Sequence, residues 1–147
     1  MLEIHEIAEK DISDIERMER EIFPDPWSQK GISDTWKQNH ALILGAWLEG
    51  RMIGYVVFYY VLDEGEIVRI AVDAACRRQG AADQMLKELW RFCSEKEITR
   101  MMLDVRKSNK PAIYFYQSHG FVEDGIRKNY YENPSEDAIL MSCESGR

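Results

Sequence analysis

Residues 66–93 read EIVRIAVDAACRRQGAADQMLKELWRFC, in which a strand-like run passes through a basic turn with one glycine into a helix-like run. Residues 66–72 are mostly apolar and of strand length, whereas apolar side chains recur at helical spacing from Ala82 to Cys93. A glycine at such a turn lets main-chain N–H groups approach a ligand, and the unpaired amides of a helix's first turn favour an anion. The stretch therefore predicts a strand, a turn and a helix that together seat a phosphate or pyrophosphate.

The predicted anion seat comprises Arg77, Arg78, Gln79, Gly80, Ala81 and Ala82. Its main-chain amides would hold the phosphate groups, while the two arginines meet the remaining charge from outside. The sequence has neither the Gly-x4-Gly-Lys-Ser/Thr loop of ATP-binding proteins nor the Gly-x-Gly-x-x-Gly turn of dinucleotide-binding folds. By spacing alone, an ordinary surface loop explains the turn as well as an anion-binding site does. Other segments of the sequence are needed to choose between the two.

The 147-residue chain alternates strand-like and helix-like runs without a repeat, a low-complexity tract or a linker. The pattern predicts the order β-α-α-β-β-β-α-β-α-β-β, with strands near residues 2–7, 41–47, 52–62, 66–72, 100–105, 121–131 and 136–143 and helices near 11–23, 28–38, 81–93 and 109–119. Gly50 would supply the turn between the second and third strands. Hairpins mixed with crossovers indicate an α+β fold, a single domain over residues 1–147. We expect a central mixed, mostly antiparallel sheet of about seven strands flanked by about four helices.

The composition is acidic, with a formal net charge of −7. Such a charge argues against a broad grip on nucleic-acid phosphates, the interaction that dominates nucleic-acid affinity. An acidic field can steer a basic peptide or an amine toward the protein, although the usual role of net charge is solubility. We therefore expect no direct nucleic-acid partner.

Cysteines, histidines and the first residues give no sign of a disulfide framework, a metal site or a membrane anchor. The three cysteines lack Cys-x-x-Cys spacing, and the three histidines stand far apart without Asp, Glu or Cys companions at ligand spacing. The opening MLEIHEIAEK is partly acidic, unlike a signal peptide, and the longest apolar run, YVVFYYVL, is too short to span a bilayer. We expect a cytoplasmic protein without a metal.

Several segments resemble one protein family. Residues 72–82, VDAACRRQGAA, resemble the acetyl-CoA-binding signature Gln/Arg-x-x-Gly-x-Gly/Ala of the GNAT N-acetyltransferases, with Arg77, Gly80 and Ala82 at its fixed positions. Residues 103–121, LDVRKSNKPAIYFYQSHGF, resemble the strand and helix that finish the family's cofactor site. The resemblance narrows to the RimI-type branch, the ribosomal-protein-alanine N-acetyltransferases, in the segments FPDPWS, LDEGEIVRIAVD and IRKNYYENPSEDAILM.

The resemblance implies acetyl-CoA as co-substrate, with its pyrophosphate in the anion seat. Ile70, Ala71 and Val72 would offer main-chain groups on an opened strand edge to the pantetheine arm, a mode of binding in which apolar residues can hold a ligand. Asn109 would contact the cofactor, although an asparagine before KPAI is also a good helix N-cap. Both roles are compatible.

Acetyl transfer to an amine needs a neutral nucleophile and a proton for the departing thiolate. The resemblance implies that Asp104, where the family has a glutamate, is a general base acting through a water, and that Tyr116 is the proton donor. An aspartate is one methylene shorter and serves if a water bridges the gap. The alternatives are a structural hydrogen bond for Asp104 and a core-facing aromatic role for Tyr116. Arg69, a charge inside EIVRIAV, could pair with Asp104, which would keep Asp104 ionised and make it a poorer base.

The acceptor groove would be framed, by the same resemblance, by Trp27, Tyr130 and Tyr131. Negative charge for a basic N-terminal peptide could come from Glu21, Asp25, Glu66 and Glu132. The predicted function is acetyl transfer from acetyl-CoA to the N-terminal α-amine of a protein, first among the candidates an N-terminal alanine of a small-subunit ribosomal protein. An α-amine, with an ordinary pKa of about 8 against about 10.4 for lysine, is the easier amine to deprotonate at neutral pH. The alternatives are acetylation of a small amine or a lysine side chain, and a non-catalytic coenzyme A sensor; we expect a monomer or weak dimer.

Overall fold

The computed structural model, which describes residues 1–77 and 79–145, has one sheet with the strand order β1-β2-β3-β4-β5-β7-β6. Its strands are β1 (Leu2–Glu6), β2 (Ala41–Leu48), β3 (Arg51–Val61), β4 (Glu64–Val72), β5 (Arg100–Arg106), β6 (Val122–Tyr131) and β7 (Glu136–Glu144). Its helices are α1 (Ile12–Ile22), α2 (Gln29–Trp36), α3 (Ala81–Glu95) and α4 (Lys110–Ser118), with 3₁₀ turns η1 (Glu9–Asp11) and η2 (Ala74–Cys76). Only β4 and β5 pair in parallel within this sheet of the described residues. The predicted α+β fold, its element order and its mixed, mostly antiparallel sheet are confirmed.

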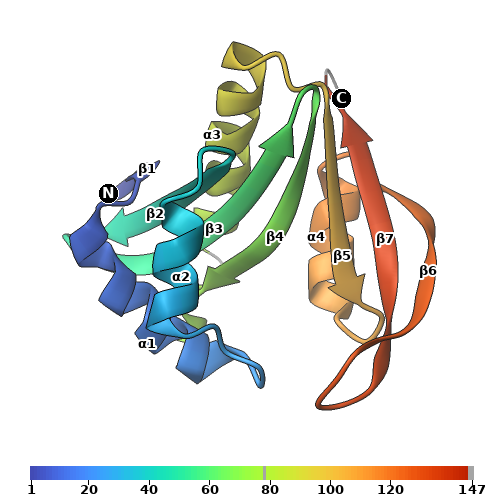
Figure 1. Cartoon of the computed structure of the whole chain (residues 1–147), viewed down its shortest axis with the longest axis horizontal. Helices are drawn as coiled ribbons and strands as arrows, with labels where there is room; N and C mark the ends of the chain where they lie inside the picture. Colours follow the sequence, from blue (N-terminus) through green and yellow to red (C-terminus); the bar gives the residue numbers. More distant parts are fainter. Residues whose placement is uncertain (78, 146–147) are drawn as a thin grey trace.

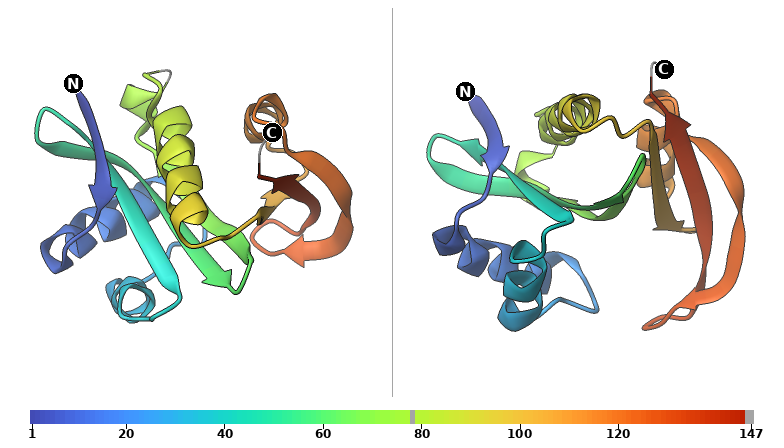
Figure 2. Two further views of the ribbon diagram at one scale, coloured as in Figure 1. Left: turned by 90° about the horizontal axis from the view of Figure 1, so that it is seen from above. Right: turned by 45° about the horizontal axis from the view of Figure 1, so that its top comes forward.

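Helices cover both faces of the sheet, with α1 and α2 on one side and α3 on the other (Figure 2). The core on the α1 side includes Ile12, Ile15, Met18, Ile32, Tyr55 and Val57. The core on the α3 side, to which α4 also contributes, includes Val56, Phe58, Met85, Leu89, Leu103 and Tyr116. Successive residues of β3 thus enter opposite cores, as the two-residue period of a strand requires. This explains why β3 reads as a continuous apolar run.

Local sequence signals set several of the element boundaries. The Ser28 hydroxyl accepts a hydrogen bond from the Gly31 amide at 3.0 Å, so α2 begins where its cap predicts. The helix ends at Trp36, two residues before the predicted end. Glu49 and Gly50 both have positive φ, 51° and 81°, and turn β2 into β3 as expected from the glycine. In the described part of the chain, no helix is long and apolar enough to cross a membrane.

β4 and β5 pair along only part of their length and then separate, which opens the middle of the sheet (Figure 1). The last pair is Ile67 with Leu103. Next to it, β4 has a bulge, because Val57 of β3 lies opposite Arg69 while the following Phe58 lies opposite Ile67. A bulge bends its strand and increases the local twist. The edge of β4 that faces β5 is therefore unpaired from residue 68 to residue 72.

Candidate active site

Two adjoining cavities lie where β4 and β5 separate. The first, here called the α4 cavity, has a volume of about 440 Å³ and reaches Asn109, Ala112 and Tyr116. The second, the β6 cavity, has a volume of about 490 Å³ and reaches Tyr130 and Glu132. Both cavities are lined by Asp25, Ile67, Val68, Arg69, Asp104 and Tyr131. The two cavities therefore form one cleft that passes between the separated strands, with Asp104 at the junction.

The carboxylate of Asp104 influences the pKa of several side chains in this cleft. On β5 it alternates with the buried Leu103, so its half-buried side chain points away from the α3-side core. Burial, and then the charge of Asp104, raise the pKa of Glu66 and of Tyr130 above their ordinary values. The same two causes raise the pKa of Tyr131 to about 12. The charge of Asp104 thus raises the pKa of three titratable neighbours in the β6 cavity.

Tyr116 lines the α4 cavity from α4, opposite β5. Its side chain is 4% exposed and packs edge-on against Phe115 and Phe121. Burial, with a smaller effect from Tyr131, raises the pKa of Tyr116, so the phenol keeps its proton at neutral pH. The hydroxyl makes no hydrogen bond to another side chain or main-chain group among residues 1–77 and 79–145. Tyr116 thus belongs to the core, as one alternative predicted, and also presents a protonated hydroxyl to the cleft.

Arg69 pairs with an acid at the cleft, but that acid is not Asp104, the partner considered from the sequence. Its Nε donates to Glu19 Oε2 at 3.1 Å and its Nη2 to Glu19 Oε1 at 2.8 Å. A further hydrogen bond runs from Nη2 to the Asp25 carbonyl at 2.9 Å, and the guanidinium lies 3.7 Å from the centre of the Phe23 ring. The reason is geometric: α1 places Glu19 over β4, while at the level of Arg69 the strands β4 and β5 no longer pair. The positive charge of Arg69 is therefore neutralised by the carboxylate of Glu19 on α1.

Glu19, which organises the cleft wall, is not among the site residues predicted from the sequence. Its side chain is fully buried, and it also accepts hydrogen bonds from the Tyr55 hydroxyl and, at 2.8 Å, from the Trp27 amide. Together, Glu19 and Arg69 hold the 23–27 loop, which lines both cavities. The sequence does contain an indication of this burial, because position 19 falls on the apolar stripe of α1, between Ile15 and Ile22. A charge on a buried stripe predicts a buried partner.

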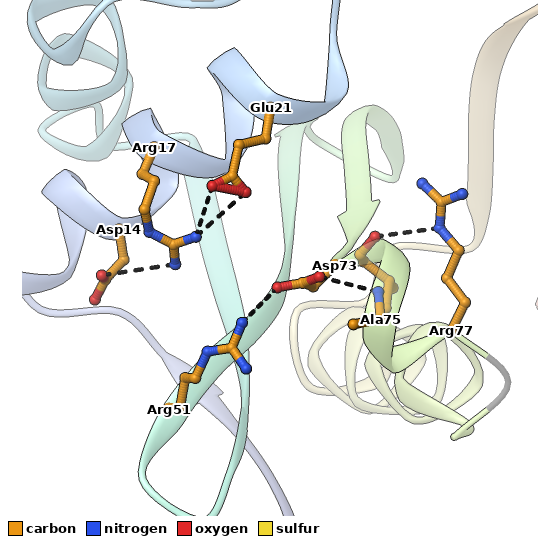
Figure 3. A network of polar contacts seen from close by, with 8 residues as sticks. Asp14, Arg17, Glu21, Arg51, Asp73, Ala75 and Arg77 are labelled. Carbon is orange, nitrogen blue, oxygen red and sulfur yellow. Dashed lines mark hydrogen bonds and ion pairs between the residues drawn. The ribbon is translucent and has the colours of Figure 1, made fainter.

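The anion seat begins where β4 ends (Figure 3). Asp73 accepts hydrogen bonds from Arg51 Nη2 at 2.7 Å and from the Ala75 amide at 3.1 Å, and Arg77 Nε donates to a main-chain carbonyl of β4 at 3.3 Å. Gly80 has a φ of 82° and precedes the first residue of α3, whose first-turn amides are free of helical partners. Arg78 lies outside the described residues. The strand, turn and helix around an amide-lined helix start are thus as expected.

The structure brings some of the predicted residues together and leaves others outside the cleft. Trp27, Tyr130 and Tyr131 line the β6 cavity, together with Asp25, Glu66 and Glu132. Ile70, Arg77 and Asn109 line the α4 cavity, and Asn109 Oδ1 also caps α4 by accepting from the Ala112 amide at 3.3 Å. Among the described residues, Ala71, Val72, Gln79, Gly80, Ala81 and Ala82 line neither cavity. Glu21 pairs instead with Arg17 at 3.2 Å (Figure 3).

Comparison with known proteins places the chain in a family. The model of the acetyltransferase (GNAT) family matches residues 12–121. The [ribosomal protein bS18]-alanine N-acetyltransferase of Escherichia coli K12 is 35% identical over 119 residues, which are 80% of each chain. The enzyme of the same name from Haemophilus ducreyi is 31% identical over 142 residues, 95% of this chain and 97% of the relative.

Solved structures agree with this match. The crystal structure of the ribosomal-protein-S18-alanine N-acetyltransferase from Escherichia coli superimposes with a TM-score of 0.90 at 32% identity, covering 98% of this chain and 94% of that one. Arabidopsis thaliana NAA60 in complex with acetyl-CoA shares the fold, with a TM-score of 0.89 at 18% identity over the whole of both chains. With the cleft between β4 and β5 and the helix start beyond it, these matches show that the chain belongs to the GNAT family of acetyl-CoA-dependent N-acetyltransferases.

Proposed function

We propose that this enzyme acetylates the N-terminal α-amine of a protein, with the alanine N-terminus of a ribosomal protein bS18 as the first candidate. One observation carries the proposal: the β6 cavity is walled by Trp27, Tyr130 and Tyr131 and reaches Asp104, where it meets the α4 cavity. Aromatic walls suit the side chains of an extended peptide, and a carboxylate at the junction suits its amine. The relatives named above, which act on bS18 by name, supply the candidate acceptor.

Acetyl-CoA supplies an activated acetyl thioester when it is bound. The residues around the α4 cavity fit this group. The edge of β4 beyond its last pair with β5 offers main-chain groups to an amide-containing arm at Ile70, and Asn109 lines the same α4 cavity. The Val72 carbonyl on this stretch accepts a hydrogen bond from Arg77 Nε at 3.3 Å. The seat from Arg77 to Ala82, with the positive φ of Gly80 and the first amides of α3, suits a pyrophosphate.

Two residues of the chain carry out the proton transfers, one as the base and the other as the acid. Asp104 Oδ takes a proton from the acceptor's ammonium, through a water because its side chain is short, and leaves a neutral amine. Tyr116 Oη holds the proton that the departing thiolate needs, because burial keeps the phenol protonated. The two groups line the α4 cavity from different elements, Asp104 from β5 and Tyr116 from α4.

We also infer a cytoplasmic enzyme whose partner is a basic protein and not a nucleic acid, working as a monomer or weak dimer. The net charge of −7 supports a basic partner, since an acidic surface attracts cationic chains and repels phosphates.

A peptide panel tests the proposal. The protein is incubated with acetyl-CoA and three acceptors: an alanine-starting peptide with an internal lysine, the same peptide with its N-terminus blocked, and a small primary amine. Mass spectrometry then locates the acetyl group. We expect acetylation of the α-amine of the first peptide and none of the blocked one. Acetylation of the lysine in both peptides, or of the small amine alone, would refute the proposal.

A further inference from the structure

A histidine that directly follows α4 is bound to the first turn of α3. The Nε2 atom of His119 lies 2.7 Å from Oδ1 of Asp83, a residue 36 positions earlier in the chain. Asp83 is three residues beyond Gly80, at the start of the helix whose first amides belong to the anion seat. His119 is three residues beyond Tyr116, which lines the α4 cavity. The contact therefore joins the helix of the anion seat to the helix of the α4 cavity.

The hydrogen bonds of the His119 ring require both of its nitrogens to carry protons. Nδ1 lies 2.8 Å from the carbonyl oxygen of Phe115, and Nε2 faces the Asp83 carboxylate, so both neighbours are acceptors. The Ser118 hydroxyl, 3.1 Å from Nδ1, donates its own hydrogen to the Phe115 carbonyl at 2.6 Å and leaves only lone pairs for the ring. A neutral imidazole has one N–H, whereas an imidazolium has two. Only the cationic form of His119 therefore satisfies the whole arrangement.

Three elements pack around this contact. On α3, Lys87 lies one turn beyond Asp83, and its Nζ is 3.1 Å from Asp83 Oδ2. On β7, the Cys143 thiol donates to the His119 carbonyl, 3.8 Å away. On α4, the centre of the Phe115 ring lies 4.4 Å from that of His119, close enough to stabilise a cation. His119 first, and Lys87 second, hold the pKa of Asp83 below its ordinary value, so the carboxylate is ionised at neutral pH.

The sheet does not by itself fix the spacing between the anion seat and the α4 cavity. β4 leads into α3 and β5 leads into α4, and the two strands no longer pair beyond Ile67 and Leu103. The contact between His119 and Asp83 bridges the two helices through side chains that are 24% and 39% exposed. Loss of one proton from His119 would remove its positive charge and leave one of the two acceptors without a donor. Such a change weakens the link without unfolding either helix.

We propose that protonated His119 and Asp83 form a clasp that fixes α4 relative to the anion seat, which makes both side chains positioning residues for acetyl-CoA. This role rests on the proposed function, in which acetyl-CoA occupies the seat and the α4 cavity, and it holds whatever the acceptor is. A preorganised site binds its ligand more tightly than one that the ligand must order. The affinity for acetyl-CoA should therefore be higher while His119 carries its second proton, and lower where histidines are neutral, above about pH 7.5.

Calorimetry of acetyl-CoA binding to the wild type and to His119→Gln, at pH 6 and at pH 8.5, tests the clasp. Glutamine keeps an N–H donor but no charge, and comparison of the two proteins at one pH cancels the titration of the phosphates of acetyl-CoA. We expect the variant to bind about 3- to 10-fold more weakly than the wild type at pH 6 and about equally at pH 8.5.

Variants on α3 complete the experiment. Asp83→Asn should weaken binding at pH 6 as His119→Gln does, and the double variant should be no weaker than either single one, because both changes remove the same interaction. Arg91→Gln is the matched control, since it breaks an exposed pair with Glu88, at 3.1 Å, on the same helix. Its affinity for acetyl-CoA should equal that of the wild type at both pH values.

A second readout needs no ligand. Ring ¹⁵N NMR of His119 should show both nitrogens protonated at pH 6, and the Nε2 signal should move in Asp83→Asn, which removes the carboxylate it faces. Equal affinity of wild type and His119→Gln at pH 6, or a weakening of the same size at both pH values, would overturn the proposal, even if the variant unfolded at a lower temperature. If the wild type bound no acetyl-CoA, the proposed function would fail instead, while an Nε2 signal unmoved by Asp83→Asn would by itself exclude the clasp.

Discussion

Replacement of Arg69 by methionine should destabilise the protein strongly, because it breaks a buried ion pair from one side. The Arg69 side chain is 14% exposed and Glu19 is fully buried. The change removes both hydrogen bonds to Glu19 and the one to the Asp25 carbonyl, and leaves a carboxylate in the core with only the Tyr55 hydroxyl and the Trp27 amide. Removal of one partner from a buried pair costs about 3–5 kcal/mol. Since Glu19 keeps two donors, we expect a loss near the lower end, about 3 kcal/mol.

The assay is equilibrium unfolding in urea, with two companion variants. Arg17→Met is the surface control: Arg17 pairs with Glu21 at 3.2 Å and Asp14 at 3.9 Å (Figure 3), but its side chain is 37% exposed. Such a pair contributes about 1 kcal/mol or less. The double variant Arg69→Met with Glu19→Gln removes the orphaned charge and should be more stable than Arg69→Met alone. A loss below about 1 kcal/mol for Arg69→Met, or a double variant no more stable than the single one, would show that Arg69 does not compensate a buried charge on Glu19.

Three further outcomes follow from the described side chains. Tyr116→Phe should lower kcat about 100-fold while leaving the unfolding temperature unchanged, because the hydroxyl has no partner in the described fold; unchanged turnover would exclude it as the proton donor. Burial raises the pKa of the Cys93 thiol to about 12, so a thiol reagent at pH 8 should modify Cys93 only after unfolding, as peptide mapping would show. His119, with Lys87 second, holds the pKa of Asp83 below its ordinary 3.8. Ionised Asp83 therefore stabilises the fold above that pH, and the difference in unfolding temperature between wild type and Asp83→Asn should vanish as the pH falls below 3.8; a gap that persists in acid would contradict this.

The order of elements could be predicted from the sequence because local patterns carry it. A two-residue period marks strands, a stripe at helical spacing marks helices, and Ser28, Gly50 and Asn109 mark boundaries by their own hydrogen bonding or backbone freedom. Asp104 was placed by its segment's resemblance to a family. Each of these signals lies within a short stretch of chain.

The organisation of the cleft could not be predicted in the same way. Glu19 and Arg69 are separated by 50 residues. No pattern within either segment indicates that α1 packs over β4 at the position of Arg69. The bulge beside Ile67, which sends Arg69 to the α1 face, depends on the pairing with β3 and leaves no mark in the sequence. Glu66 was expected only as general negative charge, because its position beside Asp104 follows from a parallel register that sequence patterns do not reveal. Charges inside apolar runs are the signal that such contacts exist.

Whether the enzyme acts on protein N-termini is decided by the site of acetylation on an intact acceptor. Unacetylated ribosomal protein bS18 is incubated with the enzyme and acetyl-CoA, and the product is mapped by mass spectrometry. We expect a single acetyl group on the N-terminal alanine, formed far more slowly by the Asp104→Asn and Tyr116→Phe variants. Acetyl groups confined to lysine side chains, or tight binding of acetyl-CoA without any transfer, would contradict it.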